Sequence, residues 1–371
     1  MRKKHFLFAS VLALLCGSST LHAQDFKLTS SGYFKNQGVD VMAFDDIYPE
    51  GHQGGVCIIM NGHRVATNGD IRLEATPGQW QPVPKQLDRK LGDNSITATL
   101  CYPDSSRHLT GFNPMIYPDL HLIYTVNVES KGKNIEVTVD LDRPIPQEFI
   151  GKVGFNLEFF PGSLFGKPWI MDGQSGIFLQ QPNSPLMTTQ PNYLHTGNYH
   201  DGKKSLADMD KLIGKGYSPI VADDIISEPY AKGRKFTSRP DDPYNKVTIE
   251  SLSGDLQLFD GRMNHNNGWF VLRSNIKPGV TKGAVKWIIT PNVVADWMYQ
   301  PVIQTSQIGY HPTQDKEAVI EMDIRDNRKE TAQIIRIDAD GEKVVKNVTP
   351  ANWGKFLRYN YLKVNFTDVK E

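Results

Sequence analysis

The stretch Cys57-Ile58-Ile59-Met60-Asn61-Gly62-His63-Arg64-Val65-Ala66 decides the fold class. Two largely apolar arms flank Asn61-Gly62, a dipeptide that tolerates positive φ at both central positions of a type I′ turn. The stretch therefore predicts two antiparallel strands joined by a two-residue turn. It sets the pattern for most of the chain.

The same pattern recurs from residue 39 to about residue 290, where short apolar or alternating runs end at turn dipeptides. Two further hairpins are predicted in this way: residues 120–128 with 135–141, and residues 247–252 with 255–259 around Ser253-Gly254. Helix signals are sparse, and only Ser205 followed by residues 206–212 predicts a short helix. The fold class expected is all-β, with a large antiparallel β-sandwich.

Length and composition predict two domains. The chain has 371 residues with 31 Gly and 23 Pro, and 39% of its residues are hydrophobic, which fits a folded chain with many turns. Residues 287–290 are interpreted as a closing strand and a new set of strands follows, so we place the junction at 296–302. We expect a β-sandwich accessory domain at 24–300 and a second domain at 301–371. The stretch from 182 to 239 has few strand signals, which is typical of a functional or lid-like loop.

The first residues predict export. Arg2, Lys3 and Lys4 precede a short apolar run at 6–15, and Ala23 supplies the small residue that a signal peptidase requires. Residues 1–23 are therefore interpreted as a cleavable signal peptide, and the mature chain is expected in the periplasm or outside the cell. The residues before Cys16 lack the small side chain needed for lipid attachment, which favours a soluble protein over a lipoprotein.

Charge and hydropathy argue against two classes of partner. The chain has 41 basic and 41 acidic residues, and removal of the signal peptide leaves a net charge of about −3. No basic excess is present to attract nucleic acid or an anionic membrane. No apolar stretch after residue 24 is long enough to span a bilayer. We therefore expect no nucleic-acid partner and no membrane span.

Residues 302–371 carry the most specific pattern. They open with Val302-Ile303-Gln304-Thr305-Ser306-Gln307-Ile308-Gly309-Tyr310-His311-Pro312, followed by Lys316-Glu317-Ala318-Val319-Ile320. The alternation at 303–307, the turn-permitting Gly309 and the strand-ending Pro312 predict a strand, a corner and a second strand. A hairpin at 331–345 turns on Asp340-Gly341, and residues 360–366 alternate as a further strand.

This pattern resembles the opening of the immunoglobulin-like domain that precedes the catalytic domain in many family-9 glycoside hydrolases. Trp353-Gly354 and Asn365-Phe366-Thr367 echo two later elements of the same domain. The resemblance covers about one fifth of the chain and implies a cellulase-type immunoglobulin-like domain at 301–371. Residues 24–300 look like the β-sandwich found ahead of this module in some Bacteroidetes-type polysaccharide-degrading proteins, and a mutarotase-like sandwich is one candidate.

We expect the second domain to be incomplete at its C-terminus. An immunoglobulin-like sandwich uses about seven strands in roughly 100 residues, whereas about five strands are predicted in residues 302–371. In the family that this region resembles, a further Gly-x-Tyr strand completes the sheet.

The catalytic residues of that family are missing from this chain. Hydrolysis requires two carboxyl groups across the scissile bond, and the family supplies them from an Asp-x-Gly-Asp motif and a distant Glu. Asp338-Ala339-Asp340-Gly341 is similar only superficially, because it lies between two strands where Asp-Gly is turn chemistry. The resemblance implies a non-catalytic N-terminal segment of a β-1,4-glucanase or cellulase-type hydrolase, for structural support or carbohydrate binding. Its partners would be a plant-type polysaccharide or oligosaccharide of the β-glucan class and a missing or separate family-9 catalytic domain.

An enzyme in its own right is the alternative. His195, His200 and His265 with Glu158 could form an acid–base set of the sugar-epimerase type, which would place an epimerase or lyase site in the 24–300 sandwich. Surface or structural histidines are the simpler interpretation. The spacing matches no metal motif and no phosphate-binding loop or nucleophile elbow is present, so no metal or cofactor is predicted.

Three loops combine aromatic, amide and charged residues, a combination typical of sugar binding. The carbohydrate-binding candidates are Trp169, Tyr199, His200, His265, Asn267 and Trp269. The simpler interpretation of the two tryptophans is that they anchor the sandwich core.

The two cysteines outside the signal peptide leave two alternatives. Cys57 and Cys101 lie in apolar stretches, and in an oxidising compartment they form either a disulfide or two buried free thiols. Two cysteines carry no spacing pattern that decides between these.

Overall fold

The structure is a computed structural model, and it describes residues 25–45, 54–74, 77, 84–102, 106, 120–182, 186–188, 225–263 and 268–370. The predicted signal peptide and the predicted helix at 205–212 lie outside these residues. The described elements are almost all β-strands, so the all-β fold class is confirmed. None of the described helices is long and apolar enough to span a membrane.

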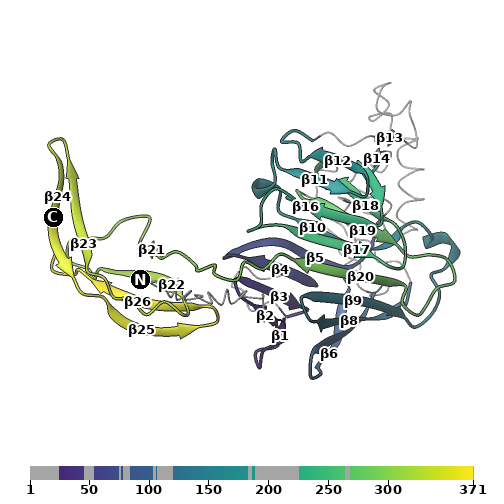
Figure 1. Ribbon diagram of the computed structural model, residues 1–371, viewed down its shortest axis with the longest axis horizontal. Helices are drawn as coiled ribbons and strands as arrows, with labels where there is room; N and C mark the ends of the chain where they lie inside the picture. The colour runs from purple at the N-terminus through teal and green to yellow at the C-terminus, as the bar shows by residue number, and fades with distance from the viewer. Residues whose placement is uncertain are drawn as a thin grey trace, which may run out of the picture.

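Two antiparallel sheets make up the first part of the chain (Figure 1). The described strands of the first sheet are, in spatial order, β1 (Lys27–Leu28), β2 (Phe34–Asn36), β3 (Val39–Ala43), β4 (Val56–Met60), β5 (His63–Leu73), β10 (Val153–Phe159), β19 (Phe270–Asn275), β18 (Leu256–Asp260) and β15 (Ala231–Gly233). Those of the second are β12 (Gln174–Ile177), β11 (Pro168–Met171), β16 (Lys235–Ser238), β17 (Val247–Ser251), β20 (Val285–Pro291), β9 (Asn134–Leu141), β8 (Ile123–Lys131), β7 (Ser95–Cys101) and β6 (Lys85–Leu91).

Smaller elements connect or flank these sheets. They are the 3-10 helices η2 (Gln147–Phe149), η3 (Pro161–Ser163) and η5 (Gly261–Met263), and the strand pair β13 (Leu186–Thr188) and β14 (Ile225–Ser227). The described part of the predicted loop at 182–239 therefore does contain strands, since β15 and β16 also fall in it. Each of these strands has only three or four residues, which is too short for an alternation of apolar and polar residues to be recognised in the sequence.

The predicted hairpin at 57–66 forms as expected. β4 and β5 pair with Met60 opposite His63, and Asn61 and Gly62 adopt φ of 53° and 85°. Both central residues thus have the positive φ of a type I′ turn. The hairpin at 120–141 is confirmed by the pairing of β8 with β9.

The predicted hairpin around Ser253-Gly254 is wrong in its pairing. Both strands exist, but β17 belongs to the second sheet and β18 to the first. β17 pairs with β16 and β20, whereas β18 pairs with β19 and β15. The chain crosses between the layers here, because each strand buries its apolar residues from its own side of the core.

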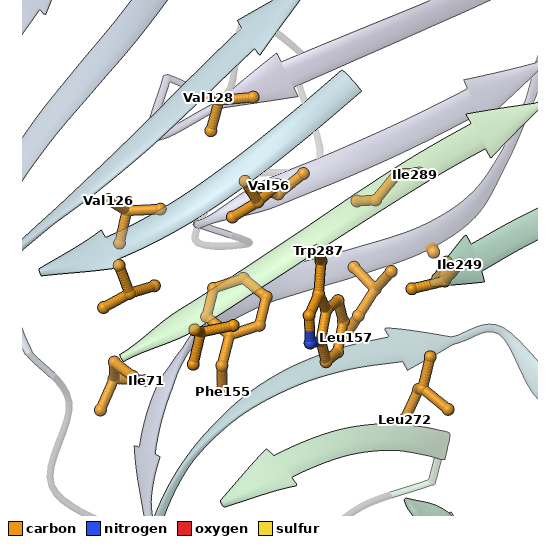
Figure 2. Close-up of a cluster of buried hydrophobic side chains, with 14 of the residues drawn as sticks. Val56, Ile71, Val126, Val128, Phe155, Leu157, Ile249, Leu272, Trp287 and Ile289 are labelled. Carbon is orange, nitrogen blue, oxygen red and sulfur yellow. The ribbon is translucent and has the colours of Figure 1, made fainter. Parts of the chain in front are cut away.

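The core lies between the two sheets, and Trp287 of β20 is at its centre (Figure 2). The indole ring of Trp287 is fully buried and packs edge-to-face on Phe155 of β10, with ring centroids 5.0 Å apart. Its Nε1 donates to Ser274 Oγ at 3.1 Å, so the polar atom of the buried ring is satisfied. Burial of one side chain of this size stabilises the fold by about 3 kcal/mol.

The second part of the chain begins with β21 (Val302–Gln304), whose first residue is the last residue of the predicted junction at 296–302. β20 ends at Pro291, and β21 opens a four-stranded sheet in the order β21, β22 (Glu317–Asp323), β26 (Tyr359–Asn365) and β25 (Ala351–Phe356). β23 (Ala332–Asp338) and β24 (Gly341–Val348) form a separate hairpin that turns at Asp338 and Gly341, as predicted.

The two sheets of the second part differ in the burial of their apolar side chains. Leu362 and Val364 of β26 are buried, which confirms the alternation predicted for 360–366. In the β23–β24 hairpin, by contrast, Ile335, Ile337 and Val344 are 42%, 75% and 44% exposed. A two-stranded ribbon without a covered apolar face is marginally stable in water.

We therefore predict that the amides of β23 and β24 exchange with solvent at least about tenfold faster than those of β8 and β9. The β8–β9 hairpin is a suitable reference, because it also has a two-residue turn but lies between β7 and β20. Hydrogen-exchange mass spectrometry of the full chain measures both. Equal protection of the two hairpins would contradict the prediction.

Candidate functional site

The candidate site lies on the outer face of the first sheet, where β5, β10 and β19 are neighbours. The residues of β10 that point into the core are apolar, so Asn156 and Glu158 point to the opposite face, since successive side chains of a strand alternate. Arg273 of β19 lies opposite Asn156, and Thr67 of β5 lies opposite Glu158. All four side chains are buried although this face is polar.

Arg273 holds two neighbours in one hydrogen-bonded network. Its Nη1 donates to Glu74 Oε1 at 3.2 Å and to Asn156 Oδ1 at 3.0 Å. Asn156 Nδ2 donates to the same Glu74 oxygen at 2.6 Å. Arg273 Nη2 donates to the backbone oxygens of Glu74 and Lys152, both at 3.0 Å. Since the Arg273 and Glu74 side chains are each 1% exposed, this ion pair is shielded from water and connects the end of β5 to β19.

Glu158 lies beside a second set of polar groups. Asn68 Nδ2 donates to Glu158 Oε2 at 2.6 Å. Asn68 has a φ of 55° and lies where the register between β5 and β10 shifts, and such bulges redirect side chains. Asn68 and Arg72 are only half-buried, so the cluster meets solvent here, whereas it is closed at Arg273 and Glu74.

Two polar atoms in this second set are incompletely bonded. Arg72 Nε and Thr67 Oγ1 are buried and have no hydrogen-bond partner among the described residues. Buried donors and acceptors in folded proteins are nearly always paired, with protein or with ordered water. These two atoms therefore mark a place where water or a ligand hydroxyl group would complete the bonding.

An aromatic pair lies at the end of the same strands. Trp269 immediately precedes β19 and Phe160 immediately follows β10, and their ring centroids are 4.3 Å apart in an edge-to-face contact. Both rings are half-buried. Glu158 lies opposite Val271, which is two residues from Trp269, or roughly 7 Å along the strand.

Burial changes the acidity of this region. It raises the pKa of Glu74 to about 7, because desolvation of the carboxylate outweighs the attraction of Arg273 and the hydrogen bond from Asn156. It also raises the pKa of Asp70 in β5 to about 6, although Arg72 and the hydroxyl group of Tyr124 oppose this. A carboxyl group that exchanges its proton near neutrality suits acid–base chemistry.

The structure brings together two of the residues singled out in the sequence, Glu158 and Trp269. Trp169 lies in β11 of the other sheet and is 6% exposed in the core, so the core-anchor interpretation describes it. The remaining candidates lie outside the described residues: His195, Tyr199, His200, His265 and Asn267.

The structure contradicts the disulfide alternative, because no disulfide joins Cys57 to Cys101. Cys57 of β4 packs in a small apolar cluster with Tyr33, Met42 and Ile59, apart from the main core. Cys101 of β7 follows the buried Leu100 and points away from the core of the second sheet. Two thiols on the outer faces of different sheets cannot reach the Cα separation of about 6 Å that a disulfide requires.

Most residues of the polar network were not predicted from the sequence. Its members are Thr67, Asn68, Arg72, Glu74, Asn156 and Arg273. The only signal was the alternation of polar residues in β5 and β10, and in a strand with one buried face this pattern normally indicates residues that face water. That the second face is also covered is a property of the tertiary structure.

We predict that Glu74→Gln alters the dependence of stability on pH. The pKa of Glu74 in the folded state, about 7, is above its ordinary value of 4.5, so between these pH values the folded state keeps a proton that the unfolded chain releases. The free energy of unfolding should therefore fall as the pH rises through this range. The substitution should remove about 3 kcal/mol of that fall.

Urea denaturation across this pH range measures the effect. Glu148→Gln is the matched control, because Glu148 is exposed in η2. Asp70 acts in the same direction and remains in both variants, so some pH dependence should persist. An unchanged pH profile in the Glu74 variant would contradict the assignment.

Comparison of the chain with protein-family models and with curated proteins finds no match. The geometry of this face and the resemblance described for residues 302–371 are therefore the features that bear on function.

Proposed function

We propose that this chain is a non-catalytic, carbohydrate-binding segment of a polysaccharide-degrading system, with ligands of the β-1,4-glucan class. One observation carries the proposal: the half-buried ring of Trp269 lies on the same sheet face as Glu158, Asn68 and Arg72. Aromatic rings pack on the apolar faces of sugar rings, and planar polar groups hydrogen-bond to the sugar hydroxyls. A site of this composition suits an uncharged, hydroxyl-rich chain.

The individual groups have complementary roles in this proposal. The carboxylate of Glu158 accepts a hydrogen bond from a sugar hydroxyl, and Asn68 holds that carboxylate in place. Arg72 Nε and Thr67 Oγ1 gain the partners that they lack among the described residues. Because pairing a buried polar atom recovers a desolvation cost of about 1–3 kcal/mol, these two contacts favour a ligand rich in hydroxyl groups.

The resemblance of residues 302–371 to the domain that accompanies family-9 catalytic domains supports the β-1,4-glucan class. An accessory segment that binds the same chain as its enzyme raises the local concentration of substrate without taking part in the chemistry. The second part of the chain would then connect the sugar-binding sandwich to a catalytic partner.

Acid–base chemistry on a sugar is the second candidate. It is favoured by the pKa of Glu74, which is about 7, and by the presence of Glu158 on the same face. A general acid must reach the atom that it protonates, however, and Glu74 lies at the end of the cluster that is closed to solvent, with its Oε1 bound by Arg273 and Asn156. This geometry favours binding over turnover.

Calorimetric titration of the full chain with cello- and xyloglucan-oligosaccharides, together with an assay for reducing-sugar release, tests the proposal. We expect binding without turnover. Release of reducing sugar by this chain alone would replace the proposal with the second candidate. The absence of both binding and turnover would contradict both.

We predict that Trp269→Ala weakens oligosaccharide binding at this face roughly tenfold, since an aromatic contact contributes about 1 kcal/mol or more. Trp353→Ala is the matched control, because Trp353 is a 58% exposed tryptophan in β25 of the second part. Circular dichroism establishes that both variants fold. Unchanged affinity in folded Trp269→Ala would remove Trp269 from the site.

A further inference from the structure

The two parts of the chain meet beside the β1–β3 edge of the first sheet (Figure 1). A cleft lies at this junction. It has a volume of about 430 Å³, which is within the range of small-molecule sites. One wall comes from β1, β2 and the turn before β3, and the other from β22, β26 and the connecting segment at 296–301. None of its lining residues belongs to the site on the outer face of β5, β10 and β19.

Two glycine-containing turns of the sandwich hold the aromatic residues of the connecting segment. Gly38 has a φ of 66°, and a Cβ placed there would lie 2.6 Å from the ring of Trp297. Gly62 has a φ of 85°, and its Cβ would lie 2.8 Å from the ring of Tyr299. Each turn therefore needs glycine both for its backbone conformation and for the close approach of a ring.

Hydrogen bonds fix the position of Trp297. Gln37 Nε2 donates to the backbone oxygen of Trp297 at 2.9 Å from the sandwich side, and Arg325 Nη2 donates to the same oxygen at 2.5 Å from the second part. Arg325 is itself held by Asp323, through Nε to Oδ1 at 2.8 Å and Nη2 to Oδ2 at 2.9 Å. The tryptophan is thus bound from both walls.

The walls are also joined directly. Arg358 Nη1 of the β25–β26 turn donates to Asp40 Oδ2 of β3 at 2.5 Å, and both side chains are largely buried. Leu357, beside it, packs against the apolar cluster that contains Tyr33 and Met42. A buried ion pair next to an apolar contact holds the two parts in one arrangement, so the cleft is formed before any ligand binds.

The cleft presents groups that are available for a ligand. Tyr299 lies between two further rings, 6.3 Å from Trp297 and 5.2 Å from Tyr359, which gives one continuous aromatic surface. Among the described residues, the indole Nε1 of Trp297 and the ammonium group of Lys27 make no hydrogen bond or ion pair, and Lys35 interacts with the carboxylate of Asp40 only through longer-range charge attraction. These donors stand beside the aromatic surface on the lining of the cleft.

We propose that this junction cleft is a second carbohydrate site, which packs one or two sugar units against Trp297 and Tyr299 and binds their hydroxyls through Lys27, Lys35 and the Trp297 N–H. The ligand class rests on the proposed function, whereas the existence of the cleft does not. A site between the two parts would let one glycan chain be held at two places on the same molecule, which raises overall affinity through effective concentration.

The test is calorimetric titration of the full chain with a cello-oligosaccharide long enough to occupy a single site, using Trp297→Ala, Trp269→Ala and the control Trp353→Ala. We expect two binding events in the unmodified protein. Trp297→Ala should abolish or weaken one of them at least about tenfold and leave the other unchanged. Lys35→Ala keeps the aromatic surface intact and should weaken the same event severalfold, which covers the case in which Trp297→Ala does not fold.

The outcomes separate this inference from the proposed function. Loss of one event in Trp297→Ala and of the other in Trp269→Ala supports both sites. Binding that depends on Trp269 but not on Trp297 or Lys35 overturns the junction site and leaves the proposed function intact. Binding that depends on Trp297 alone supports the junction site and overturns the site on the sheet face, whereas no binding in any protein overturns both.

Discussion

The apolar core between the two sheets is the constraint on which the rest of the structure depends. At the centre of this core, Trp287 packs on Phe155, and the indole N–H of Trp287 donates a hydrogen bond to Ser274. The packing of this core determines which side chains of β10 point inward. Because successive side chains of a strand alternate, it also determines that Asn156 and Glu158 point outward. The candidate site is therefore a geometric consequence of core packing in the middle of the sheet.

Strand β10 is buried on both faces, so the charged groups on its outer face lose much of their hydration. Ion pairs and hydrogen bonds compensate for this loss only in part. Arg273 compensates Glu74 and connects it to Asn156, yet desolvation still raises the pKa of Glu74 to about 7. Burying charge is costly unless each charge is paired, and the ion pair between Arg273 and Glu74 offsets part of this cost. The bonding is complete around Arg273 and incomplete around Thr67 and Arg72, which distinguishes the structural half of the cluster from the half suited to a ligand.

At the junction between the two parts of the chain, the backbone conformation of two glycines determines how closely the parts approach. Glycine at positions 38 and 62 allows positive φ and removes the Cβ atoms that would collide with Trp297 and Tyr299. The turns that reverse the sandwich strands thus also receive the rings of the connecting segment. With Asp40 and Arg358 paired beside them, the second part is attached to the sandwich through several unrelated contacts.

Local chemistry in the sequence was sufficient to determine the all-β class, the type I′ turn at Asn61-Gly62 and the alternation of β26, because each depends on neighbours along the chain. Glu158 could be singled out as an acid–base candidate and Trp269 as a sugar-binding candidate, but the sequence could not place them on one face. Only the tertiary structure decided that β17 and β18 lie in different sheets, since a turn dipeptide specifies a reversal of the chain and not the layer that each arm joins. The tertiary structure also decided that Arg72, Glu74 and Arg273 lie beside Glu158, and that the segment at 296–301 packs on the sandwich. These contacts join residues that are far apart in sequence, and the packing of the two sheets determines them.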